Sequence, residues 1–316
     1  MELKKHDRTW VHDGGRKIEA TVDVVQPRHL ILRLDNGAHA KVLRTSDRVA
    51  VVRNRMTFRF LSRECHPGLL RVFARVTGAS GKHGYACETL TPHPMMVGMD
   101  PHPLTASLRL LLKSGVILGG ALGIMHASRR IHGDTTPHNV LMRGDTPVLI
   151  DFETSVLLGQ FSSYRPNDHS DNSVFATSGC CSPEQATRKR VTAASDVYCL
   201  ALTMLSWATG EYGVTKNCGD GNSFDAMWRC ARAQYPYWGK AEERIRAKKA
   251  IDLFKGCIQE SSDREPADGN AFAVRCQHLL DTLPKKVLDR PVIERGPPEF
   301  PAGSPGFVRT SATSLA

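Results

Sequence analysis

The stretch between residues 131 and 153 constrains this sequence more than any other part of it. Two short apolar runs flank an Arg-Gly-Asp turn at 143–145, a pattern typical of a small hairpin. Asp134 and Asn139 precede the first run, and Asp151 directly follows the second. Hard divalent cations prefer such oxygen ligands, so this region predicts a metal-binding loop with a further carboxylate near a nucleophile. In an ordinary surface hairpin, the same three side chains would serve only the turns.

The order and spacing of these residues match two loops of a known family. His-Gly-Asp-x-x-Pro-x-Asn, which ends at Asn139, and the later Asp151-Phe152 together resemble the catalytic and metal-binding loops of the protein kinase family. The resemblance implies that Asp134 orients the hydroxyl of the substrate, and that Asn139 and Asp151 hold Mg²⁺ against the phosphates of ATP. The His-Gly-Asp form is common in bacterial and divergent members of that family, and it removes no metal ligand.

Three features of the sequence depart from the family pattern. Glu153 replaces the Gly that follows Asp-Phe, which restricts the backbone and adds negative charge near the metal site. The turn at 26–29 contains no Gly, although the family covers the phosphates with a Gly-rich loop. The segment 46–64 predicts a helix that begins at a Ser-Asp cap, yet Glu64 at its far end is the only candidate partner for the strand Lys of the family.

Ahead of this helix, the sequence predicts three antiparallel strands. Apolar residues alternate or run together at 18–25, 30–34 and 38–43, and Asp-Asn-Gly joins the last two as a hairpin turn. The third strand resembles the Val-Ala-x-Lys strand of the family, so Lys41 is expected to reach the α- and β-phosphates of ATP. A Lys that points outward from an edge strand is the alternative interpretation.

The segment after the helix leads to the expected hinge between two lobes. A His-Pro segment resembles the one that precedes the fourth strand of the family, and 71–77 and 85–90 predict two more strands. The resemblance places the hinge at the end of the second, where backbone groups of Glu88 and Leu90 are expected to bind the edge of adenine. Residues 92–103, rich in Pro and Met, predict a linker between the lobes.

The rest of the sequence predicts a larger, mostly helical lobe. An apolar stripe over 104–125 predicts a long helix ahead of the catalytic loop, and His132 is expected to anchor that loop by packing rather than to act as a base. Ser-Asp-Val-Tyr resembles a family helix, whose Asp196 is expected to cap the helix and to hydrogen-bond to the catalytic loop. Ser-Pro-Glu resembles Ala-Pro-Glu, so Glu184 is expected to pair with Arg264.

Together these features imply an α+β protein with a bilobal kinase-like fold, in which a small antiparallel β-sheet lobe precedes a larger, mostly helical lobe. A loop rich in Ser, Asn and Asp is expected to be exposed, and Thr177 and Ser178 after it are candidate phosphorylation sites. The predicted parts are a lead-in at 1–17, an N-lobe at 18–90, a C-lobe at 91–286, and a disordered Pro-, Gly- and Ser-rich tail at 287–316.

Composition narrows the expected partners and location. The 42 Lys and Arg exceed the 32 Asp and Glu by 10, and this scattered positive charge favours polyanions such as ATP or acidic partners. The sequence has no zinc finger, RNP-type or helix-turn-helix signature, so nucleic acid is not expected as a partner. Nine Cys without framework spacing, and a start without a secretory signal, predict reduced thiols in a cytoplasmic protein. Arg109 and Lys113 interrupt the longest apolar stretch, so no membrane span is expected.

Three functions are compatible with the resemblance. The first is an ATP- and Mg²⁺-dependent kinase that phosphorylates Ser or Thr of an unidentified protein substrate. The second is a pseudokinase, a nucleotide-binding or scaffolding module with little turnover, which the missing glycines, the missing helix Glu and Glu153 favour. The third is a small-molecule kinase, which the Ser-Pro-Glu and Ser-Asp-Val-Tyr motifs disfavour. Because catalysis in this family is mostly positioning and metal charge, the retained Lys41 and metal ligands favour the active kinase.

Overall fold

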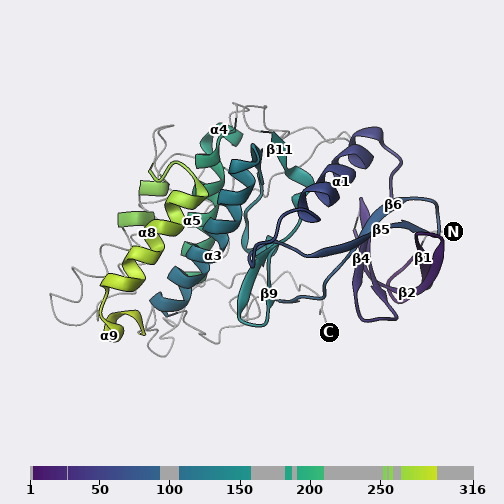
Figure 1. The fold of residues 1–316 in the computed structure, drawn as a ribbon, viewed down its shortest axis with the longest axis horizontal. Helices are drawn as coiled ribbons and strands as arrows, with labels where there is room; N and C mark the ends of the chain where they lie inside the picture. Colours follow the sequence, from purple (N-terminus) through teal and green to yellow (C-terminus); the bar gives the residue numbers. More distant parts are fainter. Residues whose placement is uncertain are drawn as a thin grey trace, which may run out of the picture.

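Two lobes of different composition make up the structure, which is a computed structural model of the chain. Figure 1 shows the strands of one lobe gathered near the N-terminus and the long helices of the other stacked beside one another. This arrangement agrees with the predicted α+β, bilobal fold. The residues that the structure describes are 3–26, 28–92, 107–157, 182–186, 191–209, 252–254, 256–258 and 265–289.

The N-lobe is a six-stranded antiparallel barrel that closes on itself. Its order is β1-β2-β3-β4-β6-β5, and β1 pairs back with β5 where Val11 lies opposite Gly78. The predicted three-stranded meander is present as β2, β3 and β4. The strands are β1 (Arg8–Asp13), β2 (Arg16–Val25), β3 (His29–Leu34), β4 (His39–Leu43), β5 (Val72–Gly78) and β6 (His83–Cys87).

Alternation along the strands decides which side chains fill the barrel. In β4, Ala40 and Val42 belong to the barrel core, so His39 and Lys41 lie on the opposite face. The outer face of β4 therefore presents two basic side chains to the rest of the chain. The core is aliphatic throughout and consists of Val11, Ala20, Val22, Leu30, Leu32, Leu34, Ala40, Val42, Val76 and Ala86.

Strand β1 shows that the prediction of a loose lead-in at 1–17 is wrong. Thr9 and Val11 are buried, and their neighbours along the strand are exposed, which is the alternation of a half-buried strand. A single aliphatic residue carries this alternation, so it gives a weak signal in the sequence. Gly14 and Gly15 both adopt positive φ and make the tight turn into β2. The small lobe therefore begins with β1.

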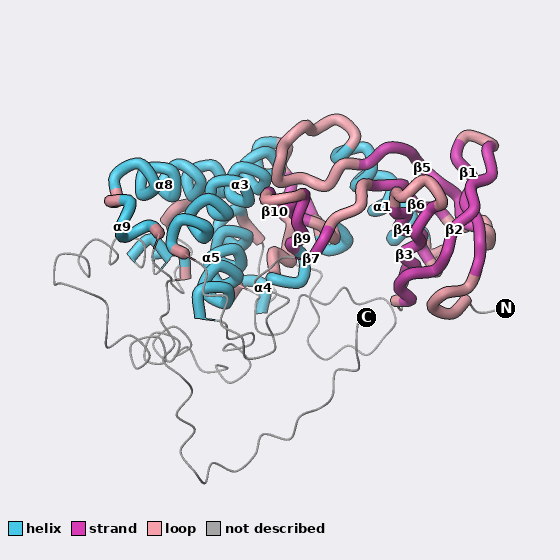
Figure 2. Tube along the Cα trace, turned by 90° about the horizontal axis from the view of Figure 1, so that it is seen from below, coloured by secondary structure: helices cyan, strands magenta, loops and turns pink. Residues whose placement is uncertain are grey.

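The C-lobe is built on long helices, with a strand hairpin between them and the N-lobe (Figure 2). Helix α3 packs against α5 and α8. Strands β9 and β10 pair around the Gly-Asp turn as predicted, and β7 pairs with β9. The elements are α3 (Leu108–Ala127), α4 (Pro183–Ala186), α5 (Ala193–Thr209), α8 (Gly269–Thr282), α9 (Lys285–Leu288), β7 (Thr91–Pro92), β8 (Arg130–Ile131), β9 (Val140–Arg143), β10 (Thr146–Leu149), β11 (Val156–Leu157), η1 (Pro137–Asn139) and η2 (Phe152–Thr154).

Helix α1 (Arg48–Leu61) joins the barrel to the C-lobe. Its N-cap is Asp47, whose carboxylate accepts from the backbone N–H of Ala50 at 3.1 Å, as the Ser-Asp pair predicts. The helix contacts β5 and β6 of the barrel and also η2, the short turn after Asp151. No acidic residue occurs within the helix.

Helix α3 meets the length and composition of a membrane span, alone among the helices in the described part of the chain. Arg109 and Lys113 therefore do not lower the hydropathy of this stretch below that of a membrane span, although we expect from the sequence that they would. More than half of the apolar window is buried, and the helix packs against α5 and α8. This packing is typical of a core helix.

Helix α9 corrects the predicted end of the C-lobe. Val287 and Leu288 are buried in the hydrophobic core, whereas the sequence predicts a disordered tail from 287 onward. Val287 and Leu288 pack α9 against the rest of the domain, although the neighbouring Lys and Asp residues are typical of a polar tail. Outside the described residues lie Thr177, Ser178, Arg264, residues 290–316, and most of the predicted linker and exposed loop.

Helices α3 and α8 cross so closely that the contact requires glycine. A Cβ added to Gly119 would lie 2.9 Å from the carbonyl oxygen of Gly269 and 3.1 Å from the nitrogen of Ala273. A Cβ added to Gly269 would lie 2.5 Å from the carbonyl oxygen of Gly119. These obstacles are backbone atoms, which cannot rotate away. Any larger residue at either position must separate the two helices.

Gly119→Ala is expected to destabilise the protein by about 1 to 3 kcal/mol, because the added methyl group overpacks a backbone contact. Helix propensity alone predicts the opposite sign, since Ala is favoured over Gly by about 1 kcal/mol within a helix. Urea unfolding followed by circular dichroism measures the difference. Lys113→Ala, at an exposed position of the same helix, is the control and should change stability by less than about 0.5 kcal/mol. Equal or higher stability of Gly119→Ala would contradict the described packing.

Candidate active site

Lys41 and Asp151 meet across the two lobes. The Nζ of Lys41, on the outer face of β4, lies 2.8 Å from the Oδ1 of Asp151, which follows β10. The side chain of Lys41 is 10% exposed and that of Asp151 is 32% exposed, so the pair lies between the protein interior and solvent. The structure thus brings together the two residues that the sequence assigns to phosphate and metal binding.

The backbone turns sharply at Asp151. This residue has φ 60° and ψ 70°, the left-handed region, which Asp tolerates better than most residues other than Gly. Phe152 is buried and packs edge-on against His132, with 5.0 Å between the ring centroids. The buried ring holds the loop after the turn, and the Asp151 carboxylate is left facing Lys41.

Asp134 and Asn139 contact each other within the catalytic loop. The Nδ2 of Asn139 donates to the Oδ2 of Asp134 at 2.7 Å and to its backbone carbonyl at 2.8 Å. The carbonyl of Asn139 accepts from the backbone N–H of Ile150 at 2.9 Å. Asn139 is therefore tied to Asp134 on one side and to the residue before Asp151 on the other.

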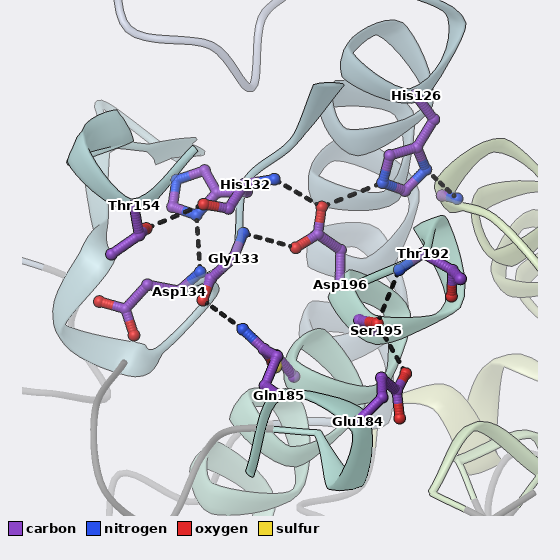
Figure 3. A network of polar contacts seen from close by, with 12 residues as sticks. His126, His132, Gly133, Asp134, Thr154, Glu184, Gln185, Thr192, Ser195 and Asp196 are labelled. Carbon is purple, nitrogen blue, oxygen red and sulfur yellow. Dashed lines mark hydrogen bonds and ion pairs between the residues drawn. The ribbon is translucent and has the colours of Figure 1, made fainter. Parts of the chain in front are cut away.

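A buried carboxylate, that of Asp196, holds the catalytic loop in place (Figure 3). It accepts the backbone N–H of His132 at 2.7 Å on Oδ2 and that of Gly133 at 2.8 Å on Oδ1. His126 donates to Oδ2 at 3.0 Å. The predicted hydrogen bonds from Asp196 to the loop are confirmed. The predicted capping role of Asp196 is not confirmed, because α5 begins at Ala193 and Asp196 lies within its first turn.

His132 anchors the loop, as predicted. Its side chain is fully buried and donates from Nε2 to the carbonyl of Ile150 at 3.0 Å. Two further side chains hold the same loop backbone: Thr154 donates to the carbonyl of His132 at 2.9 Å, and Gln185 donates to the carbonyl of Gly133 at 2.7 Å. The hydrogen bonds in Figure 3 therefore reach the loop from η2, α4 and α5.

Glu184 connects α4 to the start of α5. Its Oε1 accepts from the hydroxyl of Ser195 at 2.6 Å. This contact places the Ser-Pro-Glu motif beside the Ser-Asp-Val-Tyr helix, so the two motifs brace one another. The predicted partner Arg264 lies outside the described residues.

Glu88 lies at the expected hinge, where its side chain forms a brace with Arg143. The guanidinium of Arg143 donates from Nε to Oε2 of Glu88 at 2.5 Å and from Nη2 to Oε1. Arg143 also donates to the carbonyls of Pro67 at 2.7 Å and Leu69 at 2.9 Å. The backbone N–H of Glu88 donates to the carbonyl of Arg71 at 3.1 Å. The backbone N–H of Glu88 is therefore already bonded, and the predicted contact of Glu88 with adenine stays a prediction.

Leu90 is partly buried and packs against the larger hydrophobic core, which contains residues of both lobes. It lies beyond the end of β6, next to Thr89, which is exposed. The structure thus places Leu90 on the connection between the lobes, and its predicted contact with adenine stays a prediction.

Helix α1 offers Lys41 no acidic partner. Glu64, the candidate beyond its end, accepts from the hydroxyl of Ser128 at 3.4 Å and so faces the end of α3. The Lys–Glu ion pair of the family pattern therefore has no counterpart within α1. Among the contacts of the described residues, Asp151 is an acid that the structure brings to Lys41.

Two titratable groups near the site are uncharged near neutral pH. Burial raises the pKa of Cys87 to about 12; the charge of Lys41 lowers this pKa by a smaller amount, and the charge of Glu88 raises it. Burial also lowers the pKa of His138 in the catalytic loop, and the charge of Asp134 offsets this in part. The charge of the site therefore comes from Lys41 and the carboxylates.

The donor set fits Mg²⁺ shared with phosphates. The amide nitrogen of Asn139 is bonded to Asp134, so the Oδ1 of Asn139 and the carboxylate of Asp151 are the groups that would hold the cation. No cluster of three His, Cys, Asp or Glu occurs in the described part of the chain. Mg²⁺ commonly takes one or two carboxylates and completes its shell with water and substrate phosphates. The hydroxyl of Thr136, two residues after Asp134, is buried without a hydrogen-bond partner in the described residues, as a group that meets water or a ligand would be.

The fold is that of solved protein kinases. The kinase domain of Mycobacterium tuberculosis PknI superposes with a TM-score of 0.58 and 17% identity, over 89% of this chain and all of that one. Vaccinia related kinase 3 superposes with a TM-score of 0.59 and 13% identity, over 93% of this chain and 94% of the other. No family model matches the sequence.

Curated relatives carry the same likeness in sequence. Serine/threonine-protein kinase PknL of Mycobacterium tuberculosis is 25% identical over 275 residues, 82% of this chain and 62% of that protein. A probable LRR receptor-like serine/threonine-protein kinase of Arabidopsis thaliana is 33% identical over 180 residues, 52% of this chain and 18% of that protein. The chain therefore has the fold of protein kinases and is similar in sequence to serine/threonine-protein kinases. It spans less than two thirds of the length of these curated relatives.

Several residues of this kinase-like site give little signal in the sequence. Arg143 reads as a turn residue, yet it binds the hinge through Glu88. His126 reads as the end of an apolar helix, yet it donates to Asp196. Gln185 follows a recognised motif but is not part of it. Each acts through a partner far away in the chain, so spacing along the sequence cannot reveal it.

Asp196→Asn is expected to destabilise the protein by about 3 kcal/mol, because it leaves a buried loop N–H facing an amide group instead of a carboxylate. Urea unfolding measures the loss. Asp281→Asn, at an exposed position on α8, is the matched control and should change stability by less than about 0.5 kcal/mol. A loss for Asp196→Asn no larger than for the control would contradict the anchoring role of this carboxylate.

Proposed function

We propose that this chain is an ATP- and Mg²⁺-dependent protein kinase that transfers the γ-phosphoryl group to Ser or Thr of a protein. The observation that carries the proposal is the contact of Lys41 with Asp151 at 2.8 Å across the two lobes. Asp134 and Asn139, on the same hairpin region as Asp151, are hydrogen-bonded to each other at 2.7 Å. One cation, two carboxylates and one amide oxygen can together receive a metal-bound triphosphate.

Each group has a separate role in this proposal. Lys41 neutralises the α- and β-phosphates as a point charge. Asn139 and Asp151 hold Mg²⁺, which would neutralise charge on the transferred group when bound. Asp134 orients the attacking hydroxyl and accepts its proton. The backbone contacts of Asp196 keep the Asp134 loop in position before a substrate arrives.

The partners and the cellular compartment proposed for this kinase follow from its net charge and from its free cysteines. The net charge of +10 suits nucleotide and acidic partners. Five cysteines in the described part of the chain are free, which agrees with a reducing compartment such as the cytoplasm. The protein substrate is proposed only as a class, a protein with an accessible Ser or Thr.

A pseudokinase is the second candidate, and one observation favours it. Helix α1 has no acidic residue to pair with Lys41, so the ion pair that accompanies an assembled kinase site is not formed by this helix. Such a module would bind nucleotide through Lys41 and Asp151 with little transfer. Turnover decides between the two candidates.

Phosphate transfer from radiolabelled Mg²⁺-ATP to model protein substrates tests the proposal. Asp134→Ala is expected to lower the rate by about a hundredfold or more, because it removes a positioned general base. Asp151→Ala and removal of Mg²⁺ by a chelator are expected to abolish transfer. Asp145→Ala, in the turn of the same hairpin and exposed, is the matched control and should keep the wild-type rate.

Two outcomes would contradict the proposal in different ways. Transfer that survives both Asp134→Ala and Asp151→Ala would show that the roles are wrongly assigned. A wild-type chain that binds Mg²⁺-ATP and never transfers phosphate would establish the pseudokinase.

A further inference from the structure

His39 lies next to Lys41 on the same face of β4. Alternate residues of a strand share a face and lie roughly 7 Å apart, so His39 lies about that distance from Lys41 at the proposed phosphate site. His39 lies toward the hinge, because its Nδ1 lies 2.9 Å from Oγ1 of Thr89. In the proposed nucleotide site, Lys41 therefore lies at the phosphate end and His39 lies at the hinge end.

Both ring nitrogens of His39 are already occupied. Thr89 donates its hydroxyl proton to the carbonyl of Gly37, so its oxygen accepts from Nδ1 of His39. Nε2 of His39 lies 3.1 Å from Oδ2 of Asp23. Each ring nitrogen therefore has a polar partner, which leaves the flat faces of the ring for a ligand.

The ring is held before any ligand arrives. Asp23 on β2 is itself paired with Arg33 on β3 at 3.5 Å, and Arg33 lies opposite His39 in the strand register. The side chains of His39 and Asp23 are 23% and 24% exposed, so they are fixed yet open in part to solvent. A preorganised flat ring loses little freedom when a second flat ring stacks on it.

We propose that His39 is a base-binding residue of the nucleotide site, whose ring stacks on a purine base when the triphosphate lies at Lys41. The inference rests on the proposed function, since it requires a nucleotide between the lobes. His39 stands where the Val-Ala-x-Lys pattern has Ala, two residues before the Lys. Stacking tolerates different bases because every base has a π-face. ATP and GTP are therefore both expected to bind.

Binding of the Mg²⁺ complexes of ATP, GTP and tripolyphosphate, measured by calorimetry on the full chain, tests this role. Tripolyphosphate has no base and reports only the Lys41 end of the site. His39→Ala is expected to weaken ATP and GTP by about tenfold and to leave tripolyphosphate unchanged, as for the loss of one base–aromatic stack. His39→Phe, which keeps a flat ring, should restore most of the affinity for both nucleotides.

His12→Ala is the matched control, because His12 is an exposed histidine on β1. This variant should bind all three ligands as the wild type does. Thermal unfolding verifies that each variant is folded. His39→Gln keeps a side-chain donor but has no ring, and it replaces His39→Ala if that variant does not fold.

The outcomes separate this inference from the proposed function. A wild-type chain that binds neither ATP nor tripolyphosphate overturns both. A wild-type chain that binds both, with the ratio of the two affinities unchanged in His39→Ala, overturns the stacking role alone. Equal losses for ATP and tripolyphosphate, or a loss in His39→Phe as large as in His39→Ala, reduce His39 to a structural tie and also overturn it.

Discussion

A carboxylate that is buried away from water needs hydrogen-bond donors, and the Asp196 carboxylate finds them in the backbone of the catalytic loop. Its oxygens receive the backbone N–H groups of His132 and Gly133 and the imidazole of His126. The other nitrogen of His126 accepts from the backbone N–H of Gly269 at the start of α8. One buried charge thus links three helices of the C-lobe to the loop that carries Asp134. The reactive groups occupy fixed positions because this charge cannot be left unpaired.

The two lobes are joined by contacts of different kinds. The Arg143 guanidinium ties the hinge carboxylate of Glu88 to backbone carbonyls and so fixes the connection between the lobes. The contact of Lys41 with Asp151 is a second tie between the lobes, in which the Lys41 side chain is nearly buried and the Asp151 side chain is partly exposed. The closed barrel supports this contact by holding β4, and with it Lys41, on both sides.

The sequence predicted the parts of the fold whose signals are local. The meander, the hairpin at 140–149 and the cap of α1 depend on alternation, turn residues and one Asp, all of which lie close together in the chain. Strand β1 was missed because one aliphatic residue carries its pattern, and because its closure onto β5 is a long-range pairing. The end of the C-lobe was placed too early because Val287 and Leu288 reveal their burial only once α9 is packed.

The same distinction holds for the candidate site. Asp134, Asn139, Asp151 and Lys41 follow from motifs, and the structure brings Lys41 to Asp151 and Asn139 to Asp134. The His39 contacts with Asp23 and Thr89 join three separate strands or turns, so no motif contains them. The missing acid of α1 is visible in the sequence, but only the structure shows that Glu64 faces Ser128. Motifs therefore identify the candidate reactive groups, and the contacts that position them come from the fold.

The central claim is that Asp151 and Asn139 hold a metal ion together with the phosphates of a nucleotide. Electron paramagnetic resonance of Mn²⁺, used in place of Mg²⁺, measures this most directly by counting bound metal with and without ATP. The proposed site predicts Mn²⁺ binding that ATP strengthens in the wild type and that Asp151→Asn removes. Mn²⁺ binding that ATP does not change, or that persists unaltered in Asp151→Asn, would contradict it.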